Sequence, residues 1–94
     1  MNNEEIKKRA TKIIRHHLGK NVKIYLFGSQ AKGNTGTGSD IYIAVSASKE
    51  NREAFMKIKR ELSELPTLKK IDVINLSFTK DKFKDHIFKH AVKL

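Results

Sequence analysis

The residues best suited to chemistry lie where one apolar run stops at a Gly-Ser pair and a second apolar run starts with an aspartate. Gly28 and Ser29 follow residues 22–27, and Asp40 opens residues 40–45 after a polar, glycine-rich spacer. Glycine lets backbone amides approach a ligand, and amides together with a serine hydroxyl donate hydrogen bonds to phosphate oxygens. The Asp40 carboxylate is a hard oxygen ligand suited to Mg²⁺. The pattern predicts a phosphate and magnesium site between two strands.

Two later positions extend this prediction. Side chains alternate along a strand, so Asp40 and Tyr42 are expected on the same face. Asp72 lies near the start of another apolar run, residues 70–76. A strand-helix-strand connection of this length predicts two parallel strands, which brings Asp40 and Asp72 to one edge of the sheet. Tyrosine has an ordinary pKa of about 10, so Tyr42 is neutral at working pH and would not bind Mg²⁺ as a carboxylate at the same position would.

Helices must support these strands. Apolar residues spaced by three and four predict a helix over residues 3–18, capped by Asn3 and ended by Gly19. A second apolar stripe predicts a helix over residues 49–65, capped by Ser48. For the last helix the expected range is 80–90, the expected cap is Thr79, and the expected inward residues are Phe83, Ile87 and Ala91. The predicted class is α/β (α+β), a small mixed sheet of three or so strands with helices packed mainly on one face.

Composition limits the remaining possibilities. The 94 residues predict a single domain, 1–94, and 20 lysine and arginine residues against 10 acidic residues give a net charge of +10, which attracts anions. No cysteine is present, and no apolar run approaches a membrane span, so we expect a cytoplasmic protein without membrane attachment. The spacing of His16 with His17, and of His86 with His90, completes no recognisable zinc motif.

Taken together, Gly28-Ser29, a spacer of ten residues, Asp40-Ile41-Tyr42 and Ile71-Asp72-Val73 resemble the minimal nucleotidyltransferase (MNT) domains of the DNA polymerase beta superfamily. Their pattern is Gly-Ser, a spacer, Asp-x-Asp and a third aspartate on a later strand. The likeness runs over nearly the whole chain and implies the polymerase beta-like fold. This chain departs from the pattern at one position, because Tyr42 stands where the second aspartate is expected.

The resemblance implies transfer of a nucleoside monophosphate, AMP in the first instance, from a nucleoside triphosphate to a hydroxyl, with two Mg²⁺ ions and pyrophosphate as the leaving group. Asp40 and Asp72 would be catalytic and hold the metal. Nucleotide-binding residues by the same resemblance are Gly28, Ser29 and Lys32. Because Tyr42 removes a negative charge between two dications, we expect the metal site to be weak and catalysis to be impaired or absent.

The resemblance also implies a partner. MNT domains of this kind pair with helical HEPN proteins as antitoxin and toxin, so an antitoxin-like role is expected. Several alternatives stay open: a catalytically silent antitoxin that acts by binding, a basic nucleic-acid-binding module, and a homo-oligomer. Several of the site residues also have a purely structural interpretation. Gly28-Ser29 can form an ordinary turn, Lys32 can be a solvated lysine, and Asp72 can pair with Lys69 or Lys70.

Overall fold

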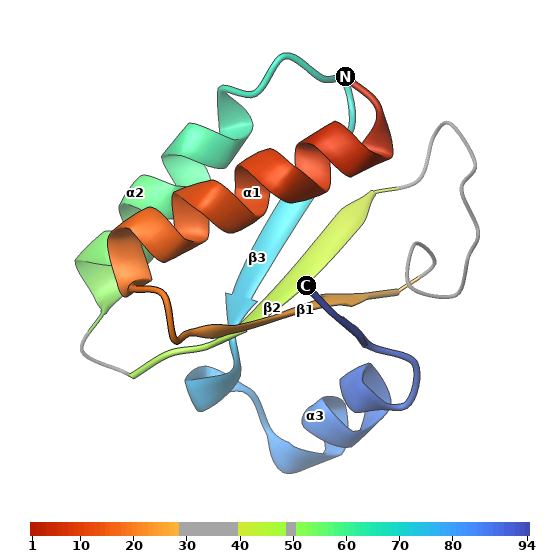
Figure 1. Ribbon diagram of the computed structural model, residues 1–94. Helices are drawn as coiled ribbons and strands as arrows, with labels where there is room; N and C mark the ends of the chain where they lie inside the picture. The colour runs from red at the N-terminus through yellow and green to blue at the C-terminus, as the bar shows by residue number, and fades with distance from the viewer. Residues whose placement is uncertain (29–39, 49–50) are drawn as a thin grey trace.

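The computed structural model describes residues 1–28, 40–48 and 51–94, which form a twisted sheet flanked by helices (Figure 1). The elements in chain order are α1 (Asn3–Leu18), β1 (Lys23–Phe27), β2 (Ile41–Ser46), α2 (Arg52–Ser63), β3 (Ile71–Asn75), the 3-10 turn η1 (Leu76–Phe78), α3 (Asp81–Phe88) and β4 (Val92–Lys93). The mixed α/β class predicted from the sequence is confirmed.

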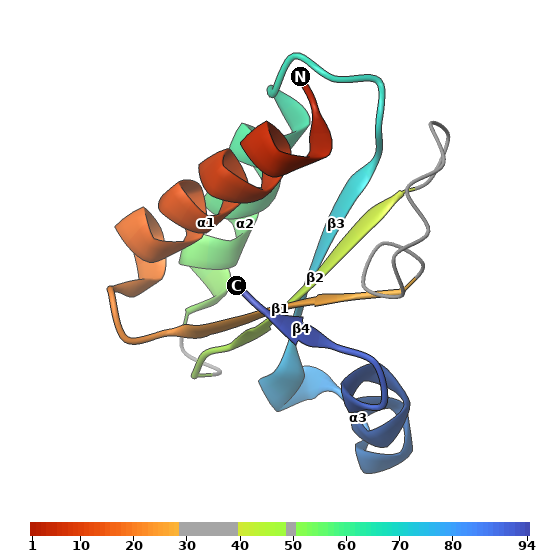
Figure 2. The same cartoon turned by 45° about the vertical axis from the view of Figure 1, so that its right-hand side comes forward.

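The sheet has the strand order β3-β2-β1-β4. Strand β1 is antiparallel to both β2 and β4, whereas β2 and β3 are parallel, as the strand-helix-strand connection predicts. Strand β4 is a fourth strand, whereas the sequence predicted three or so. It lies beside β1 in the two views (Figures 1 and 2), and its pairing continues in a hydrogen bond of 2.8 Å from the Leu94 amide to the Ile24 carbonyl.

The two faces of the sheet are covered unequally. Helices α1 and α2 lie side by side on one face, and α3 packs on the other (Figure 1). Alternation along β2 decides which residues point where, since Ile43 and Val45 enter the core beneath α1 and α2 while Ala44 packs with Leu76 and Ile87 of the α3 side. Tyr42 shares the Ala44 face, so the candidate site lies on the side of the sheet that only one helix covers.

The helix starts differ from the predicted caps. The α1 cap is Asn2, whose side chain accepts a hydrogen bond of 2.8 Å from the Glu5 amide, so the prediction of Asn3 is wrong by one residue. At α2 the cap position is Asn51, and at α3 it is Lys80, and neither side chain caps its helix. The Thr79 hydroxyl instead donates to the Asn75 carbonyl, because η1 turns the chain before α3 begins.

Helix α3 is attached through fewer residues than its pattern indicates. Ile87 is 3% exposed, but Phe83 is 47% exposed, so the prediction that Phe83 points inward is wrong. The remaining contact comes from Phe88, whose ring packs edge-on against Tyr25 of β1 with centroids 4.9 Å apart. Ala91 is half-buried. One deeply buried side chain and one aromatic pair therefore hold α3 to the sheet.

Within residues 1–28, 40–48 and 51–94, no helix combines the length and the apolar composition that crossing a bilayer requires.

Candidate functional site

The parallel pair of β2 and β3 brings the predicted acidic residues together. Tyr42 lies directly opposite Asp72 in the strand register, and Ile41 lies opposite Ile71. Opposite residues of parallel strands point to the same face, so the Tyr42 and Asp72 side chains are neighbours. Asp40 lies two residues before Tyr42, at the same end of the sheet. Tyr42 therefore stands between the two carboxylates.

Tyr42 is hydrogen-bonded to the first carboxylate. Its hydroxyl donates to Oδ2 of Asp40 over 3.2 Å. This bond and then the negative charge of Asp40 raise the pKa of Tyr42 above its ordinary value of 10.0, with smaller contributions from burial and from Asp72, and with Lys70 acting in the opposite direction. Every acidic neighbour disfavours the phenolate, so the side chain at position 42 is a neutral phenol at physiological pH.

Asp72 has a basic neighbour of its own. The Lys70 ammonium Nζ lies 3.8 Å from Asp72 Oδ2, and both side chains are substantially exposed, at 69% and 42%. Of the two lysines that the sequence offered as partners of Asp72, Lys70 is the one that pairs with it. It does not remove Asp72 from the site, because exposed ion pairs contribute little and exchange readily.

Gly28 lies directly against the Tyr42 ring. Its φ is +83°, a conformation that glycine adopts at little cost, and a Cβ atom built on it would lie 3.0 Å from Cδ2 of Tyr42. The Phe27 and Tyr42 rings lie 5.6 Å apart between centroids. The Tyr42 ring therefore packs against both the aromatic residue and the bare glycine backbone at the end of β1.

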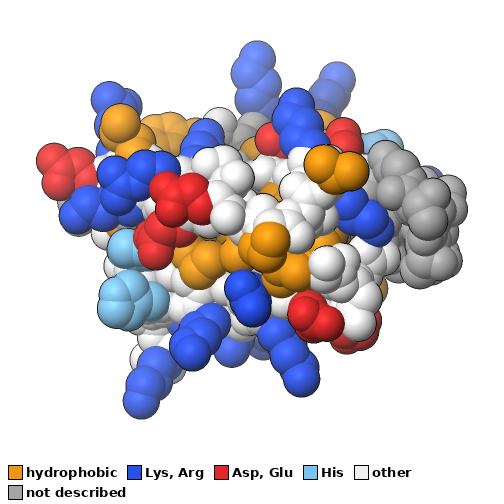
Figure 3. Space-filling view, turned by 90° about the horizontal axis from the view of Figure 1, so that it is seen from above, with side chains coloured by type: hydrophobic (Ala, Val, Ile, Leu, Met, Phe, Trp, Pro, Cys, Tyr) orange, Lys and Arg blue, Asp and Glu red, His pale blue; other side chains and the backbone are white. Residues whose placement is uncertain are grey.

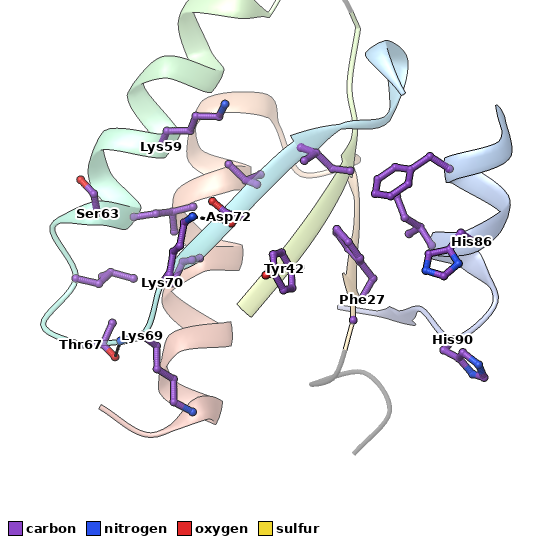
Figure 4. A pocket seen from close by; sticks show the side chains of 18 residues that line it. Phe27, Tyr42, Lys59, Ser63, Thr67, Lys69, Lys70, Asp72, His86 and His90 are labelled. Atoms are coloured by element: carbon purple, nitrogen blue, oxygen red, sulfur yellow. Dashed lines mark hydrogen bonds and ion pairs between the residues drawn. The ribbon is translucent and has the colours of Figure 1, made fainter. Parts of the chain in front are cut away.

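A broad cleft of about 900 Å³ follows β3 and includes this site. Figure 4 shows Tyr42 and Phe27 on the side nearer α3, and Lys59, Lys70 and Asp72 on the side nearer α2. His86 of α3 and His90, which follows the end of α3, also line the cleft on the side nearer α3. The cleft thus combines the Asp72 carboxylate, several cations and an aromatic wall, and Asp40 lies beside it, hydrogen-bonded to Tyr42.

Two predicted site residues cannot be placed. Ser29 and Lys32 lie outside the described residues, as does the glycine-rich spacer before Asp40. The structure brings together Gly28, Asp40, Tyr42 and Asp72. Phe27 and Lys70 also lie at the site, beside Tyr42 and Asp72, and neither was predicted as a functional residue. The position of Lys70 could have been predicted from the sequence, because residues two apart along a strand share a face and Lys70 lies two residues before Asp72.

The carboxylates at this site supply fewer ligands than two Mg²⁺ ions need. Mg²⁺ prefers several anionic oxygens in octahedral geometry, and Asp40 and Asp72 supply two carboxylates. One oxygen of Asp40 already accepts the Tyr42 hydrogen bond. In the part of the chain that the structure describes, no group of three or more His, Cys, Asp or Glu side chains is arranged to hold a metal. These residues do not fit a two-ion centre.

Gly28 just after β1, Asp40 just before β2 and Asp72 on β3 therefore lie at the same end of the mixed sheet. The sequence itself matches the family model described as "Polymerase beta, Nucleotidyltransferase" over residues 8–94. The chain therefore belongs to the polymerase beta nucleotidyltransferase family. Nucleotidyl transfer is the activity that names this family.

Solved structures show the same fold. A crystal structure from Shewanella oneidensis is similar with a TM-score of 0.72 and 22% identity, over 99% of this chain and 71% of that one. A toxin-antitoxin crystal structure with AMP-PNP has a TM-score of 0.65 and 25% identity, over 97% and 71% of the two chains. The toxin-antitoxin structure MntA-HpeT has a TM-score of 0.66 and 26% identity, over 94% and 70%.

A further similar structure is a complex of tri-AMPylated Shewanella oneidensis HEPN toxin with MNT antitoxin, at a TM-score of 0.63 and 22% identity, covering 96% of this chain and 69% of that one. At this identity the likeness concerns the fold. No curated protein matches the sequence significantly.

Proposed function

We propose that this chain is an antitoxin of the nucleotidyltransferase family that neutralises a HEPN-type partner by binding it, and that its AMP transfer is severely reduced. The antitoxin role is supported by the likeness to two toxin-antitoxin structures at 25% and 26% identity. AMP-PNP, present in one of them, is an analogue of ATP, which supports ATP as the nucleotide.

The observation that carries the proposal is the contact between Tyr42 and Asp40. A neutral phenol occupies the place of an anionic ligand, and it also engages one oxygen of the remaining carboxylate at 3.2 Å. Two dications held close together need negative charge between them, and a phenol with a raised pKa does not supply it. We propose that Mg²⁺ binding by Asp40 and Asp72 is weakened for this reason.

The nucleotide-binding role is proposed for residues around the same point. Gly28 lets the backbone approach a phosphate, and Ser29 and Lys32 would add a hydroxyl and a cation. The Tyr42 ring covers Gly28, however, so phosphates would have to displace it or pass beside it. Weak binding of the nucleotide is therefore part of the proposal.

The nucleotide half is tested by calorimetric titration of MgATP, together with a pyrophosphate-release assay. We expect Tyr42→Asp to bind MgATP at least about tenfold more tightly than the native chain, because it restores a metal ligand. Tyr42→Phe is the matched control, since it frees the Asp40 oxygen but adds no charge, and it should gain little. If the native chain turned over as fast as Tyr42→Asp, the proposal would be wrong and the chain would be an active nucleotidyltransferase.

The antitoxin half is tested by co-expression with a HEPN-type protein. We expect a complex that survives purification without nucleotide, and rescue of growth by the native chain. Asp40→Asn and Asp72→Asn should rescue equally well, because they alter only the proposed chemistry. If either substitution abolished rescue while the complex still formed, neutralisation would depend on nucleotide transfer and not on binding.

A further inference from the structure

Strand β3 forms an open edge of the sheet. In the described part of the chain it pairs only with β2. The Ile41 amide donates to the Lys70 carbonyl over 2.9 Å, which fixes the direction of every following backbone group in the parallel ladder. Asp72 and Ile74 direct their amides and carbonyls toward β2. Ile71 and Val73 direct theirs outward, away from β2. Ile71 is half-buried and Val73 is 4% exposed, so the Ile71 groups are the more accessible of the two.

A groove runs along this edge. The main cleft and a smaller adjoining hollow of about 400 Å³ both include Lys59, Val73 and Ile74, so the depression continues along β3. The smaller hollow also contains Met56 and Phe78, which are 66% and 57% exposed. Exposed apolar side chains beside free backbone groups are the features that an added strand uses: hydrogen bonds for affinity and apolar contacts for side-chain preference.

The charge of the groove selects its occupant. Four cations line it, two from α2 and two from the segment before β3: Arg52, Lys59, Lys69 and Lys70. Asp72 is the one acidic residue among the described residues that line it, and it lies 3.8 Å from Lys70. A second copy of this chain would bring the same cations and another net charge of +10, which disfavours pairing of two β3 edges.

We propose that the β3 edge binds an extended acidic segment of a partner protein, which adds to the sheet as a fifth strand beside β3. The outward groups of Ile71 would begin the ladder, and those of Val73 would join it once the incoming strand displaces the side chains that cover them. The cations of α2 and of the preceding segment would face the acidic side chains. A nucleic acid fits this groove less well, because the floor of the groove is apolar and the outward amides and carbonyls of β3 are spaced to pair with another peptide strand. The inference requires neither nucleotide transfer nor a HEPN-type partner.

The test uses fluorescence anisotropy with a labelled short peptide of alternating glutamate and valine. A peptide of alternating lysine and valine is its matched control. We expect the acidic peptide to bind the native chain and the basic peptide not to bind. Equal binding of both peptides, absence of binding by either, or tighter binding of a single-stranded RNA that competes at the same residues would overturn the proposal.

Two pairs of variants locate the binding. Ile71→Pro removes one outward amide and leaves the bonds to β2, so affinity should fall about fivefold to tenfold, whereas Ile71→Val should change it less than about twofold. Lys59→Glu should weaken binding about fivefold or more, whereas the exposed Lys57→Glu, which changes net charge equally but lies outside the groove, should not. Equal effects of the two lysine variants would reduce the interaction to net charge and overturn the proposal.

The proline variant is checked for folding by circular dichroism. If it fails to fold, hydrogen exchange on the native chain gives the same information. The amides of Ile71 and Val73 should exchange more slowly when the acidic peptide is bound, and unchanged exchange at both would contradict strand addition.

Discussion

Tyr42 contacts residues from every strand that borders the site. Its hydroxyl bonds to Asp40, its ring lies against Gly28 and Phe27 at the end of β1, and Asp72 of β3 lies opposite it. A carboxylate at this position would be smaller and charged, and it would leave the space over Gly28 open. One residue therefore changes the charge, the hydrogen bonding and the accessible space of the site together.

The first prediction concerns the ionisation of Tyr42. In a Tyr25→Phe background, where Tyr42 is the remaining tyrosine, we expect the tyrosinate absorbance to appear at a pH above 10.0. Asp40→Asn should lower the midpoint, because it removes the leading cause of the raised pKa. Asp85→Asn on exposed α3 is the control and should leave the midpoint unchanged.

The same pKa has a consequence for stability. The folded chain holds the Tyr42 proton more tightly than the unfolded chain, so the unfolded chain ionises first as the pH rises. This contribution to stability is complete below the unfolded pKa near 10.0 and is lost as the pH rises through the folded value. We expect the free energy of unfolding to fall in that window less steeply in Asp40→Asn than in the native chain. A steeper fall in Asp40→Asn would contradict the assignment.

A second prediction at this scale concerns Gly28. Gly28→Ala should destabilise the fold by roughly 1–3 kcal/mol, because the residue has a positive φ and its new Cβ meets the Tyr42 ring. Gly19→Ala is the matched control, since Gly19 also has a positive φ of +97° but nothing within 4 Å of its Cβ position.

Urea unfolding of the single and double variants separates strain from contact. Combining Gly28→Ala with Tyr42→Ala should recover roughly 0.5–1 kcal/mol relative to additivity, whereas combining Gly19→Ala with Tyr42→Ala should be additive. Additive behaviour at both glycines would mean that the Tyr42 ring moves away without cost.

At the site, the sequence predicted which residues converge but not how. Strand alternation and a parallel crossover suffice to put Asp40, Tyr42 and Asp72 together, because both rules are local. The pairing of Tyr42 with Asp72 depends on the register between two strands distant in the sequence, and that register is set by burial of Ile41, Ile43 and Val73 beneath the helices. The packing of the Tyr42 ring on Gly28 follows from the same three-dimensional arrangement and leaves no separate pattern in the sequence.

Among the elements, the long periodic helix was the easiest to predict and the short pieces were the hardest. The predicted range 3–18 agrees with α1 (Asn3–Leu18), since its apolar stripe is long and Gly19 ends it. Strand β4 has only two residues, Val92–Lys93, and both are exposed. Its strand conformation comes from pairing with Tyr25 and Leu26 of β1, which lie far away in the sequence.

The attachment of α3 provides a prediction at this scale. Ile87→Ala should destabilise the chain by about 2–4 kcal/mol, because it removes the buried side chain that packs with Ala44 and Leu76. Phe83→Ala should cost less than about 1 kcal/mol, because that ring is half-exposed. Urea unfolding followed by circular dichroism measures both. A larger loss for Phe83→Ala would mean that the helix docks through its predicted inward face after all.

The positive charge on the face of the molecule that carries α1 and α2 is spread and not gathered. On the face that carries α1 and α2, lysine and arginine side chains stand at separate points around the rim, with acidic and apolar surface between them (Figure 3). A nucleic-acid-binding surface instead concentrates cations along one track and presents aromatic rings for stacking. The net charge of +10 should therefore attract nucleic acid without holding it in one place.

The last prediction separates these two behaviours by salt dependence. We expect single-stranded RNA to bind weakly at low ionic strength, and to dissociate almost fully by about 0.2 M salt, because a diffuse interaction depends on released counterions. Charge reversal at Lys8 on α1 and at Lys82 on α3 should weaken this binding to a similar extent, since neither lysine belongs to a defined track. Anisotropy titrations of a labelled RNA at several salt concentrations provide the measurement. RNA binding that persisted at about 0.2 M salt, or that depended on one of the two lysines alone, would point to a localised site and would restore nucleic-acid binding as a function of this fold.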